Sequence, residues 1–571
     1  MEKKWIYKPT PPPHKIKQLA EAIRVDETLA TLLGQRNIFT YEEARSFFRP
    51  RLEELHNPFL MKGMHEAVAR LEQSMVQKEK VLIYGDYDVD GTTAVALVYG
   101  FLQGYHPYLD YYIPDRQKEG YGISQVAIDW AESQGFSLII ALDCGIKSVD
   151  MVVYAASKGI DFIICDHHLP GDEIPPAYAV LDPKQPDCPY PFKELSGCGI
   201  GYKLMQAFCE KNHIEGARLH DLLDLVVVSI AADIVPIIGE NRILAYFGLQ
   251  KLNHTPRAGL KALIAASGFS DEILLNIRNL VFNIGPRINA VGRLQHAKEA
   301  VELLISNDKA KAEHFAGIID AVNTQRKDLD SISTLEALEM IAANRQNGQS
   351  PFTTVLFKPD WHKGILGIVA SRCIEYYHRP TIILTQDEDG KLVGSARSSG
   401  GFDLYRAIES CADLLLRYGG HQQAAGLTME HKNLETFRER FENIVAQMIQ
   451  VEQLAPLQEV DLKISLAQIT HKFYRVLKQF APFGPKNMRP VFVTEQLVAE
   501  SPRLLREKHL SFKVKPQDGS YTFRAIGFGM GEYYQPLTEA QKIDLCYTIE
   551  ENVYQGRMYL QLRVKDIRFY A

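Results

Sequence analysis

The sequence predicts a multidomain α/β protein. Its 571 residues exceed what one hydrophobic core usually holds, which favours roughly three to four folding units. From residue 80 onward, short apolar runs alternate with helical segments, whereas the chain after residue 455 consists mainly of strand-like runs. Apolar residues at 46% and charged residues at 23% lie near globular averages, which argues against disorder, collagen and coiled coils.

The N-terminal residues 1–75 begin with a proline-rich stretch and continue as a helical pattern, as in "MHEAVARLEQSMVQ". We expect a helical segment that leads onto the next unit. The chain start lacks the apolar core of a signal peptide, and the most apolar later run, "LVVVSIAADIVPII", is short and interrupted by Asp233. The eight cysteines form no CxxC pair, which indicates reduced and mostly buried thiols. We therefore expect a cytoplasmic protein with no membrane segment.

Residues 76–240 carry the pattern of a parallel sheet. The runs "KVLIYG", "SLIIALDCG" and "DFIICDHH" are short, apolar and rich in β-branched residues, and helical segments separate them. Such strands are covered by helices on both faces, and ligands collect beyond the carboxyl ends of the strands. We expect the functional site at that edge.

Three further units follow along the chain. Residues 241–345 are mainly helical and predict a connector, and the polar "NRQNGQSP" marks its end. Residues 346–455 alternate strands with helices, which predicts a second, smaller α/β unit. Residues 456–571 contain runs such as "RPVFVTEQLVA" and "MYLQLRVKDIRFY", and five or six such strands favour a small β-barrel.

Acidic and imidazole side chains gather at the predicted strand ends. A single aspartate in such a place is usually a turn residue or a helix N-cap. Three aspartates within five positions are different, because like charges so close raise one another's pKa and destabilise the fold unless cations neutralise them. The residues concerned are Asp86, Asp88, Asp90, Asp143, Asp166, His167, His168 and Asp233.

This donor set predicts a metal centre. Carboxylate oxygens with one or two imidazoles and no thiolate suit Mn²⁺ or Mg²⁺ better than structural zinc. Two ions would activate water and stabilise the leaving oxygen of a phosphodiester. Because neighbouring side chains of an extended strand point to opposite sides, we expect only one of His167 and His168 to bind a given ion. The chemistry that these residues favour is phosphoester hydrolysis.

The same residues resemble a known family. The motifs "DYDVDGTT", "ALDCG", "DHH" and "AADIVP" are similar, in that order, to those of the DHH phosphoesterases, and "WHKGILGIVASR", "GSARSSGGFDL" and "RYGGHQQAAGL" resemble their DHHA1 domain. The resemblance extends through "NIGPRINAVGR" to the C-terminal unit and covers nearly the whole chain. Within the family it is most specific for the bacterial exonucleases that act on single-stranded DNA from its 5′ end.

The resemblance implies a fold and a set of roles. It implies a DHH domain, a helical connector, a DHHA1 domain and an OB-fold barrel, with two divalent ions, Mn²⁺ or Mg²⁺. Asp143 would bridge the two ions. His168 would contact the scissile phosphate or protonate the leaving group. Asp86 and Asp166 would either orient a metal ligand or bind a metal ion themselves. The implied metal ligands are Asp88, Asp90, Asp143, His167 and Asp233. Where many relatives have a histidine, this chain has Tyr84.

The resemblance also implies basic residues that bind the substrate. The 5′ phosphate would be held by the guanidinium forks of Arg116 and Arg397 with Ser395, and Arg287 would reach the nucleotide near the metals. His421 after Gly420 would approach a phosphate. Each lone arginine could instead be a solvated surface charge, and the Gly-Gly pair could be a helix stop.

The predicted barrel has residues suited to single strands, although strand alternation places many of its aromatics in the core. The candidates are Phe512, Lys513, Lys515, Tyr521, Phe523 and Arg524. The net charge of −6 is compatible with a nucleic-acid partner if positive charge is local. A helicase and a single-strand-binding protein are the implied protein partners of a monomeric enzyme.

The predicted function is release of 5′-mononucleotides from single-stranded DNA in the 5′→3′ direction, in DNA repair and recombination. One alternative is another DHH phosphodiesterase that acts on short oligonucleotides or cyclic dinucleotides, but such proteins usually lack a connector and barrel. The other is a non-catalytic strand-binding scaffold, whose mark would be lost metal ligands. Chain-length preference and release of mononucleotides distinguish the three.

Overall fold

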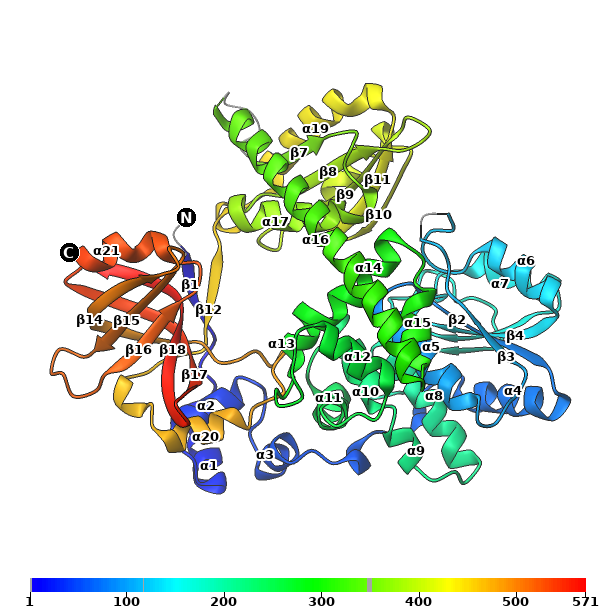
Figure 1. Cartoon of the computed structure of the whole chain (residues 1–571), viewed down its shortest axis with the longest axis horizontal. Coiled ribbons are helices and arrows are strands. Elements are labelled where there is room, and N and C mark those ends of the chain that lie inside the picture. Colours follow the sequence, from blue (N-terminus) through cyan, green and yellow to red (C-terminus); the bar gives the residue numbers. More distant parts are fainter. Residues whose placement is uncertain (1–2, 117, 347–351, 571) are drawn as a thin grey trace.

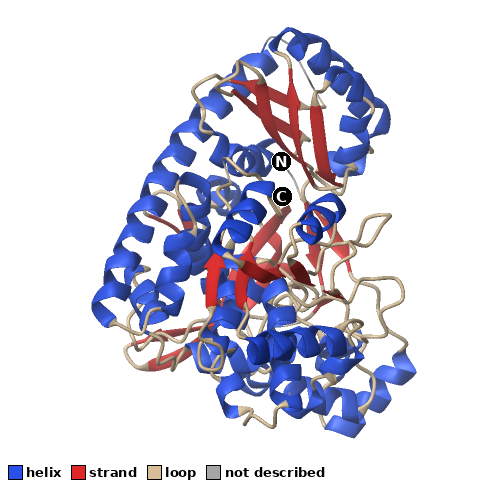
Figure 2. Cartoon of the chain, turned by 90° about the vertical axis from the view of Figure 1, so that its right-hand side faces the viewer, coloured by secondary structure: helices blue, strands red, loops and turns tan. Residues whose placement is uncertain are grey.

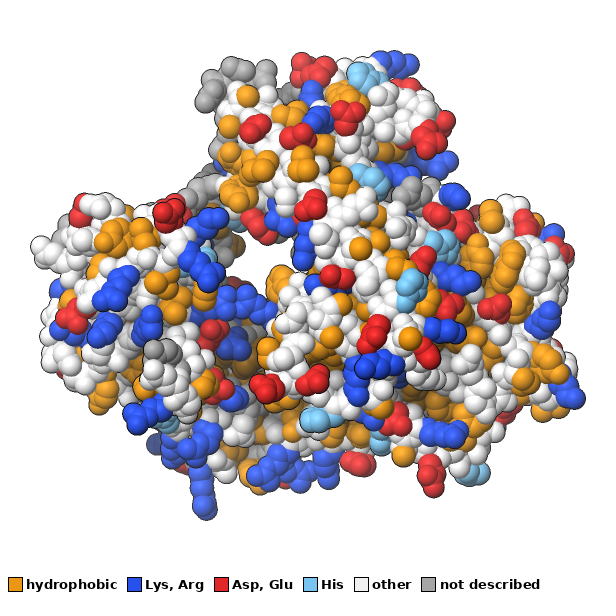
Figure 3. Space-filling view, in the orientation of Figure 1, with side chains coloured by type: hydrophobic (Ala, Val, Ile, Leu, Met, Phe, Trp, Pro, Cys, Tyr) orange, Lys and Arg blue, Asp and Glu red, His pale blue; other side chains and the backbone are white. Residues whose placement is uncertain are grey.

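The computed structural model describes residues 3–116, 118–346 and 352–570. Figure 1 shows four bodies: the parallel-sheet unit at the right, the helical connector beside it, the smaller α/β unit at the top and the barrel at the left. In Figure 3 an opening lies between the barrel, the connector and the smaller unit. The predicted multidomain α/β class is confirmed.

The first unit is built on a parallel sheet of order β3-β2-β4-β5-β6, as predicted. Its strands are β2 Lys80–Gly85, β3 Leu109–Tyr112, β4 Phe136–Leu142, β5 Asp161–Cys165 and β6 Ala179–Leu181. Its helices are α4 Met64–Gln77, α5 Val89–Leu102, α6 Gln125–Gln134, α7 Val149–Ser157, α8 Gly197–Lys211, α9 Ala217–His220 and α10 Leu223–Ala232. The apolar runs therefore form fully buried strands, because helices cover both faces.

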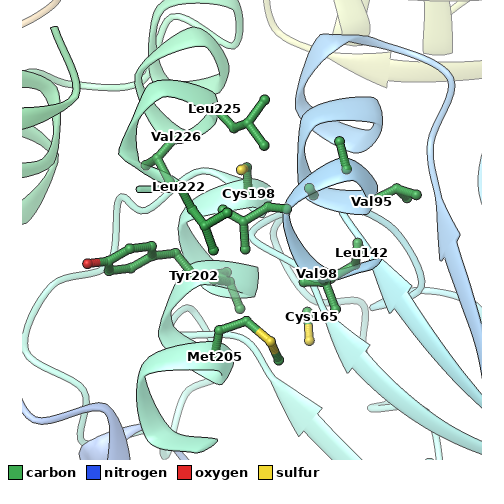
Figure 4. Packing of buried hydrophobic residues seen from close by; sticks show 14 of the residues in the cluster. Val95, Val98, Leu142, Cys165, Cys198, Tyr202, Met205, Leu222, Leu225 and Val226 are labelled. Atoms are coloured by element: carbon green, nitrogen blue, oxygen red, sulfur yellow. The ribbon is translucent and has the colours of Figure 1, made fainter. Parts of the chain in front are cut away.

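Side-chain alternation along the strands divides the core in two. Ile83 and Ile140 point to the face that α5, α8 and α10 cover, whereas Leu82 and Ile139 point to the face that α6 and α7 cover. Figure 4 shows the first of these cores, where α5, α8 and α10 pack together above Leu142 at the end of β4. These two cores fix the carboxyl ends of the strands.

The predicted connector is helical and leads into the smaller unit. It consists of α11 Gly239–Leu252, α12 Ala258–Ala266, α13 Ile277–Asn279, a π-helical turn Leu280–Ile284, α14 Gly285–Leu294, α15 Lys298–Ile305 and α16 Lys309–Gln346. The 38-residue helix α16 packs on α12 and α14 near its start and on α17, Leu366–Tyr377 of the smaller unit, near its end. One continuous helix therefore couples the two α/β units.

The smaller unit has a mixed sheet of order β10-β11-β9-β8-β7, in which only β7 and β8 are parallel. Its strands are β7 Thr354–Phe357, β8 Thr381–Gln386, β9 Leu392–Arg397, β10 Arg417–His421 and β11 Ala424–Met429. Its helices are α17 Leu366–Tyr377, α18 Leu404–Glu409 and α19 Leu434–Met448. Figure 2 shows this sheet at the top with helices on both sides.

The C-terminal unit is a barrel of order β13-β14-β15-β16-β18-β17, closed by pairing of β14 with β17. Its strands are β13 Leu462–Lys463, β14 Phe492–Leu505, β15 His509–Lys515, β16 Phe523–Gly527, β17 Lys542–Tyr554 and β18 Arg557–Tyr570, with helices α20 His471–Lys478 and α21 Tyr534–Glu539. Closure removes free sheet edges.

The N-terminal segment differs from the expectation. Its helices α1 Pro13–Ile23, α2 Glu27–Gly34 and α3 Tyr41–Phe48 share the barrel's hydrophobic core, whereas α4 and the 3-10 turn Pro58–Leu60 pack on the parallel-sheet unit. Strand β1 Lys4–Tyr7 pairs with β12 Leu457–Val460, just before the barrel. Helical periodicity identified these elements but could not indicate which distant surface completes their apolar faces.

Within the described residues, no helix is both long and apolar enough to cross a membrane. All eight cysteines are free and buried, as predicted.

Arg242 of α11 joins three parts of the chain. Its guanidinium donates to the carbonyl of Phe47 at 2.8 Å and to those of Phe480 and Ala481 at 3.0 Å each. The guanidinium carbon also lies 3.7 Å from the centre of the Phe47 ring. The connector, the N-terminal helices and the segment that enters the barrel therefore meet on one buried side chain.

We predict that Arg242→Met loosens this junction. The substitution keeps apolar bulk but leaves buried carbonyls without a donor, at a cost of about 1–3 kcal/mol for each. Calorimetry should show a lower first unfolding transition, and limited proteolysis should show faster cleavage near Phe47. The exposed Arg45, which pairs with Glu42 at 3.3 Å, provides the control Arg45→Met. Equal behaviour of the two variants would contradict the role of Arg242.

Candidate metal centre and substrate pocket

The acidic residues meet because three adjacent parallel strands end side by side. Asp86 follows β2, Asp143 follows β4, and Asp166 to His168 follow β5. Asp143 turns away from its strand in the left-handed region, at φ 62°. The helices supply the rest: Asp88 caps the N-terminus of α5 through the Gly91 amide, and Asp233 ends α10.

His167 lies at the centre of the cluster. Its Nε2 is 3.1 Å from Asp143 Oδ1, 3.6 Å from Asp233 Oδ2 and 3.7 Å from Asp90 Oδ2. Three groups of three donors have their ligand atoms within 4.8 Å of one another: Asp90, His167 and Asp233; Asp86, Asp88 and Asp143; and Asp143, His167 and His168. Asp143 belongs to two of these groups and lies 3.1 Å from His167 of the remaining one, so this edge of the sheet offers adjacent cation positions.

The protonation and hydrogen bonding of these side chains fit bound cations. Within the described part of the chain, Asp86 Oδ1, Asp143 Oδ1 and His167 Nδ1 are buried without a hydrogen-bond partner. Burial, and then the charge of neighbouring aspartates, raises the pKa of Asp143 and of Asp86 well above the ordinary value. The same causes raise the pKa of Asp233 to about 9. A divalent cation would neutralise the repulsion between the carboxylates and would coordinate the oxygen atoms that have no hydrogen-bond partner.

Asp90 and Asp166 are anchored by the fold. Asp90 accepts hydrogen bonds from the amides of Gly197 at 2.7 Å and Cys198 at 2.8 Å, where α8 begins. Asp166 accepts from the Ile146 amide at 2.9 Å and from His168 Nδ1 at 2.7 Å. Asp166 therefore orients His168, whereas Asp86 lies with the candidate ligands.

The pKa values of the two histidines are shifted in opposite directions. Burial lowers the pKa of His167, which favours the neutral imidazole that binds metals. Burial alone would also lower the pKa of His168, but the hydrogen bond and charge of Asp166 outweigh it and raise that pKa. The hydroxyl of Tyr121 lies 3.3 Å from the His168 ring nitrogens.

The expectation that His167 and His168 point to opposite sides is wrong. Strand β5 ends at Cys165, so the alternation of an extended chain does not apply, and the two ring centroids are 4.6 Å apart. Tyr84, by contrast, lies on the far face of the sheet, where its hydroxyl donates to the Gly122 carbonyl at 2.7 Å. It does not join the cluster.

A pocket of about 470 Å³ adjoins the acidic cluster. It is lined by Asp86, Tyr87, Asp88, Arg116, Tyr121, Asn289, Arg293, Arg397 and His421. The structure therefore brings three of the predicted substrate residues, Arg116, Arg397 and His421, to the candidate metal ligands. They come from the first unit, from β9 and from β10.

Arg116, Arg293 and Arg397 bring positive charge to this pocket. Arg397 Nη1 donates to Ser395 Oγ at 2.9 Å, so the predicted Ser395 orients the guanidinium and does not line the pocket. Burial, and then the charge of Arg116, lowers the pKa of Arg397. Burial followed by the charges of Arg116 and Arg397 lowers the pKa of Arg293 to about 10. Three positive guanidinium groups this close together favour the binding of an anion between them.

The sequence prediction missed Arg293 and Asn289 and instead selected Arg287. Arg287 Nε donates to Asp320 Oδ1 at 2.8 Å, and the structure does not bring it to the pocket. Asn289 and Arg293 are four residues apart on α14 and therefore share a face, whereas Arg287 does not. The four-residue spacing of these two side chains within "GPRINAVGR" could have indicated from the sequence that they share a helix face.

Glycines permit three close approaches. A Cβ at Gly197 would lie 2.6 Å from the Cβ of Asp143, and one at Gly91 would lie 2.3 Å from the Asp86 carbonyl oxygen. Gly420 lies inside β10 and not at a helix end, at φ 147°, where a Cβ would meet the Ala424 carbonyl at 2.3 Å. It shapes the hairpin that carries His421.

The barrel candidates divide by strand alternation. Phe512 is buried in the barrel core and Phe523 is packed against it, whereas Tyr521 is 48% exposed. Lys513 and Arg524 are exposed and directly opposite each other on β15 and β16. Lys515 pairs with Glu500 at 2.6 Å. The outer face of these strands is therefore basic.

Comparisons with known proteins agree with this geometry. Residues 80–230 match the DHH family N-terminal domain, residues 349–447 the DHHA1 domain and residues 460–566 the RecJ OB domain. The chain is 38% identical to the single-stranded-DNA-specific exonuclease RecJ of Bacillus subtilis, over 97% of this chain and 70% of the relative.

Solved structures give the same result. RecJ from Thermus thermophilus in complex with Mn²⁺ superposes with a TM-score of 0.84 at 27% identity, over 100% of this chain and 80% of that one. The same protein in complex with Mg²⁺ gives a TM-score of 0.79 at 26% identity, over 100% and 79%. The family resemblance of the motifs is confirmed, and the chain belongs to the RecJ family of DHH proteins.

Proposed function

We propose that the protein is a single-stranded-DNA-specific exonuclease that releases 5′-mononucleotides in the 5′→3′ direction, with two divalent ions, Mn²⁺ or Mg²⁺. One observation carries the proposal: a single pocket is lined both by Asp86 and Asp88 of the acidic cluster and by Arg116, Arg293 and Arg397. Cations bound among the aspartates suit a phosphodiester under attack, and the arginines suit the phosphate at the strand's 5′ end.

Bound among these donors, two ions would supply an activated water and neutralise charge on the scissile phosphate. The fold keeps the donors in place, since Asp90 is fixed by the amides of Gly197 and Cys198 and Asp143 is held close against Gly197. The hydrogen bond and charge of Asp166 raise the pKa of His168, which favours the protonated ring. A proton on this ring would be available to the departing 3′ oxygen.

The entry path supports a single-strand substrate. An opening lies between the barrel, the connector and the smaller unit (Figure 3), and we propose that the single strand enters through it. The basic pair Lys513 and Arg524 lies on the barrel's outer face. Positive side chains that track a backbone are typical of single-strand-binding barrels. The opening would select against the wider duplex by shape.

We also propose that the protein acts in the cytoplasm in DNA repair and recombination. A helicase would supply the single strand and a single-strand-binding protein would coat it. Similarity to the RecJ exonucleases supports these assignments.

We predict that Asp143→Asn lowers hydrolysis of a 5′-phosphorylated single strand by more than about 100-fold, because the residue approaches both cation positions. Binding of the strand should change little. Product release and gel-shift affinity measure the two effects. The exposed Asp150 on α7 provides the control Asp150→Asn. Near-normal turnover in Asp143→Asn would contradict the site.

We predict that Arg397→Ala removes the preference for a 5′-phosphorylated end. Losing hydrogen bonds to a charged phosphate costs about 1.5–3 kcal/mol, or roughly 10- to 100-fold in rate. Rates on 5′-phosphate and 5′-hydroxyl strands give the ratio. Arg406→Ala, at an exposed arginine 3.8 Å from Asp403, is the control. An unchanged ratio in Arg397→Ala would place the 5′ end elsewhere.

We predict that the metal-free protein loses stability as the pH rises from 6 to 9. The folded-state pKa values of Asp86, Asp143 and Asp233 are raised, to about 9 for Asp233, so their protons stabilise the fold at low pH and are lost as the pH increases. Mn²⁺ displaces these protons and should increase the melting temperature more at pH 8.5 than at pH 6.

The measurement is the melting temperature in chelator and in Mn²⁺ across this pH range. Asp143→Asn serves as the comparison, since it should reduce the gain from Mn²⁺. A melting temperature that does not respond to Mn²⁺ at any pH would argue against a metal centre.

A further inference from the structure

A second pocket lies in the smaller α/β unit beside the substrate pocket. It has a volume of about 300 Å³, is open to solvent, and is lined by Ser371, Ile374, Arg397, Ser398, His421, Gln423 and Ala424. Arg397 and His421 line both pockets. An anion held by these two side chains from the substrate side therefore has further room beyond them.

The two shared residues differ in how their donors are placed. Arg397 uses Nη1 on Ser395 Oγ and on the Ala396 carbonyl, whereas Nη2 lies against Gly367, where an added Cβ would be 2.3 Å away. His421 Nδ1 accepts from the Gln423 amide at 3.3 Å, so in the neutral ring the proton is on Nε2, as a donor.

The rest of the lining suits oxygen-rich, negatively charged groups. None of its seven described residues is acidic, and Ser371, Ser398 and Gln423 are polar. Ser371 lies one turn after Gly367 on α17 and therefore shares the helix face that contacts Arg397. The pocket volume is roughly the volume that ten water molecules occupy in the liquid, which is enough for additional phosphate groups.

We propose that this second pocket receives the outer phosphates of a strand whose 5′ end carries a di- or triphosphate. The inference rests on the proposed exonuclease function and extends its substrate class. The innermost phosphate would occupy the substrate pocket near Arg116 and Arg397, and the outer phosphates would pass Arg397 and His421 into the second pocket. Such strands are then cut without prior trimming.

The chemistry predicts an unusual first product. A water oxygen bonds to the phosphorus of the second nucleotide, the bond from that phosphorus to the 3′ oxygen of the first nucleotide breaks, and the departing oxygen takes up a proton. The first nucleotide leaves with all three phosphates, as a nucleoside 5′-triphosphate. The shortened strand has an ordinary 5′ monophosphate, so later products are mononucleotides.

The test compares two synthetic single strands of one sequence, with a 5′ monophosphate or a 5′ triphosphate and a label in the first nucleotide. In Mn²⁺ the wild-type protein should digest both at comparable rates, and the first labelled product of the triphosphate strand should be the nucleoside triphosphate. If the wild type digests only the monophosphate strand, or releases a labelled monophosphate first, the proposal is overturned while the exonuclease function stands.

Two variants test the pocket itself. Ser371→Tyr fills it and Gln423→Glu adds a repelling charge, and each should slow digestion of the triphosphate strand about tenfold or more while leaving the monophosphate strand unaffected. Glu375→Tyr adds the same bulk at an exposed position of α17 that does not line the pocket and should change neither rate. Equal slowing of both strands, or no slowing, in both pocket variants would overturn the proposal.

A free nucleoside triphosphate carries the same oligophosphate and serves as a further probe. It should inhibit digestion of the monophosphate strand more strongly than the corresponding nucleoside monophosphate, and Ser371→Tyr should remove that difference. Equal inhibition by the two nucleotides in the wild type would count against an oligophosphate site.

Discussion

Electrostatic repulsion at one edge of a parallel sheet is the constraint on which the remaining structure depends. Five aspartates, His167 and His168 form three overlapping groups in which the ligand atoms lie within 4.8 Å of one another, and several of their buried atoms have no hydrogen-bond partner in the described chain. A sheet end buried between helices positions these groups rigidly, and glycines at 91 and 197 let the backbone approach them closely. Divalent cations are the natural counterpart of such a cluster.

The positive side chains beside the acidic cluster are placed by the arrangement of the folding units. The acidic groups come from the first unit, whereas the three arginines of the pocket come from a loop of that unit, from α14 of the connector and from β9 of the smaller unit. The long helix α16 spans the connector and the smaller unit, and Arg242 fixes the connector to the N-terminal helices and to the segment entering the barrel. Relative placement of these units therefore decides where a phosphate can lie between the two charges.

Much of this could be predicted from sequence, because the signals are local. Buried β-branched runs indicated the sheet, and Asp86, Asp143 and His167 directly follow strands, so parallel packing brings them together. What could not be predicted depends on tertiary contacts. The sequence did not indicate that the N-terminal helices complete the barrel core, that α14 presents Arg293 and not Arg287, or that Gly197 packs against Asp143. The histidine pair was misjudged because β5 ends before it.

The most direct test of the central claim is anomalous diffraction from crystals of this protein soaked in Mn²⁺. The account predicts two peaks about 3.5–4 Å apart, with Asp143 in contact with both, Asp90, His167 and Asp233 around one, and Asp86 and Asp88 around the other. Strong peaks elsewhere with none among these side chains, in crystals of active protein, would contradict it.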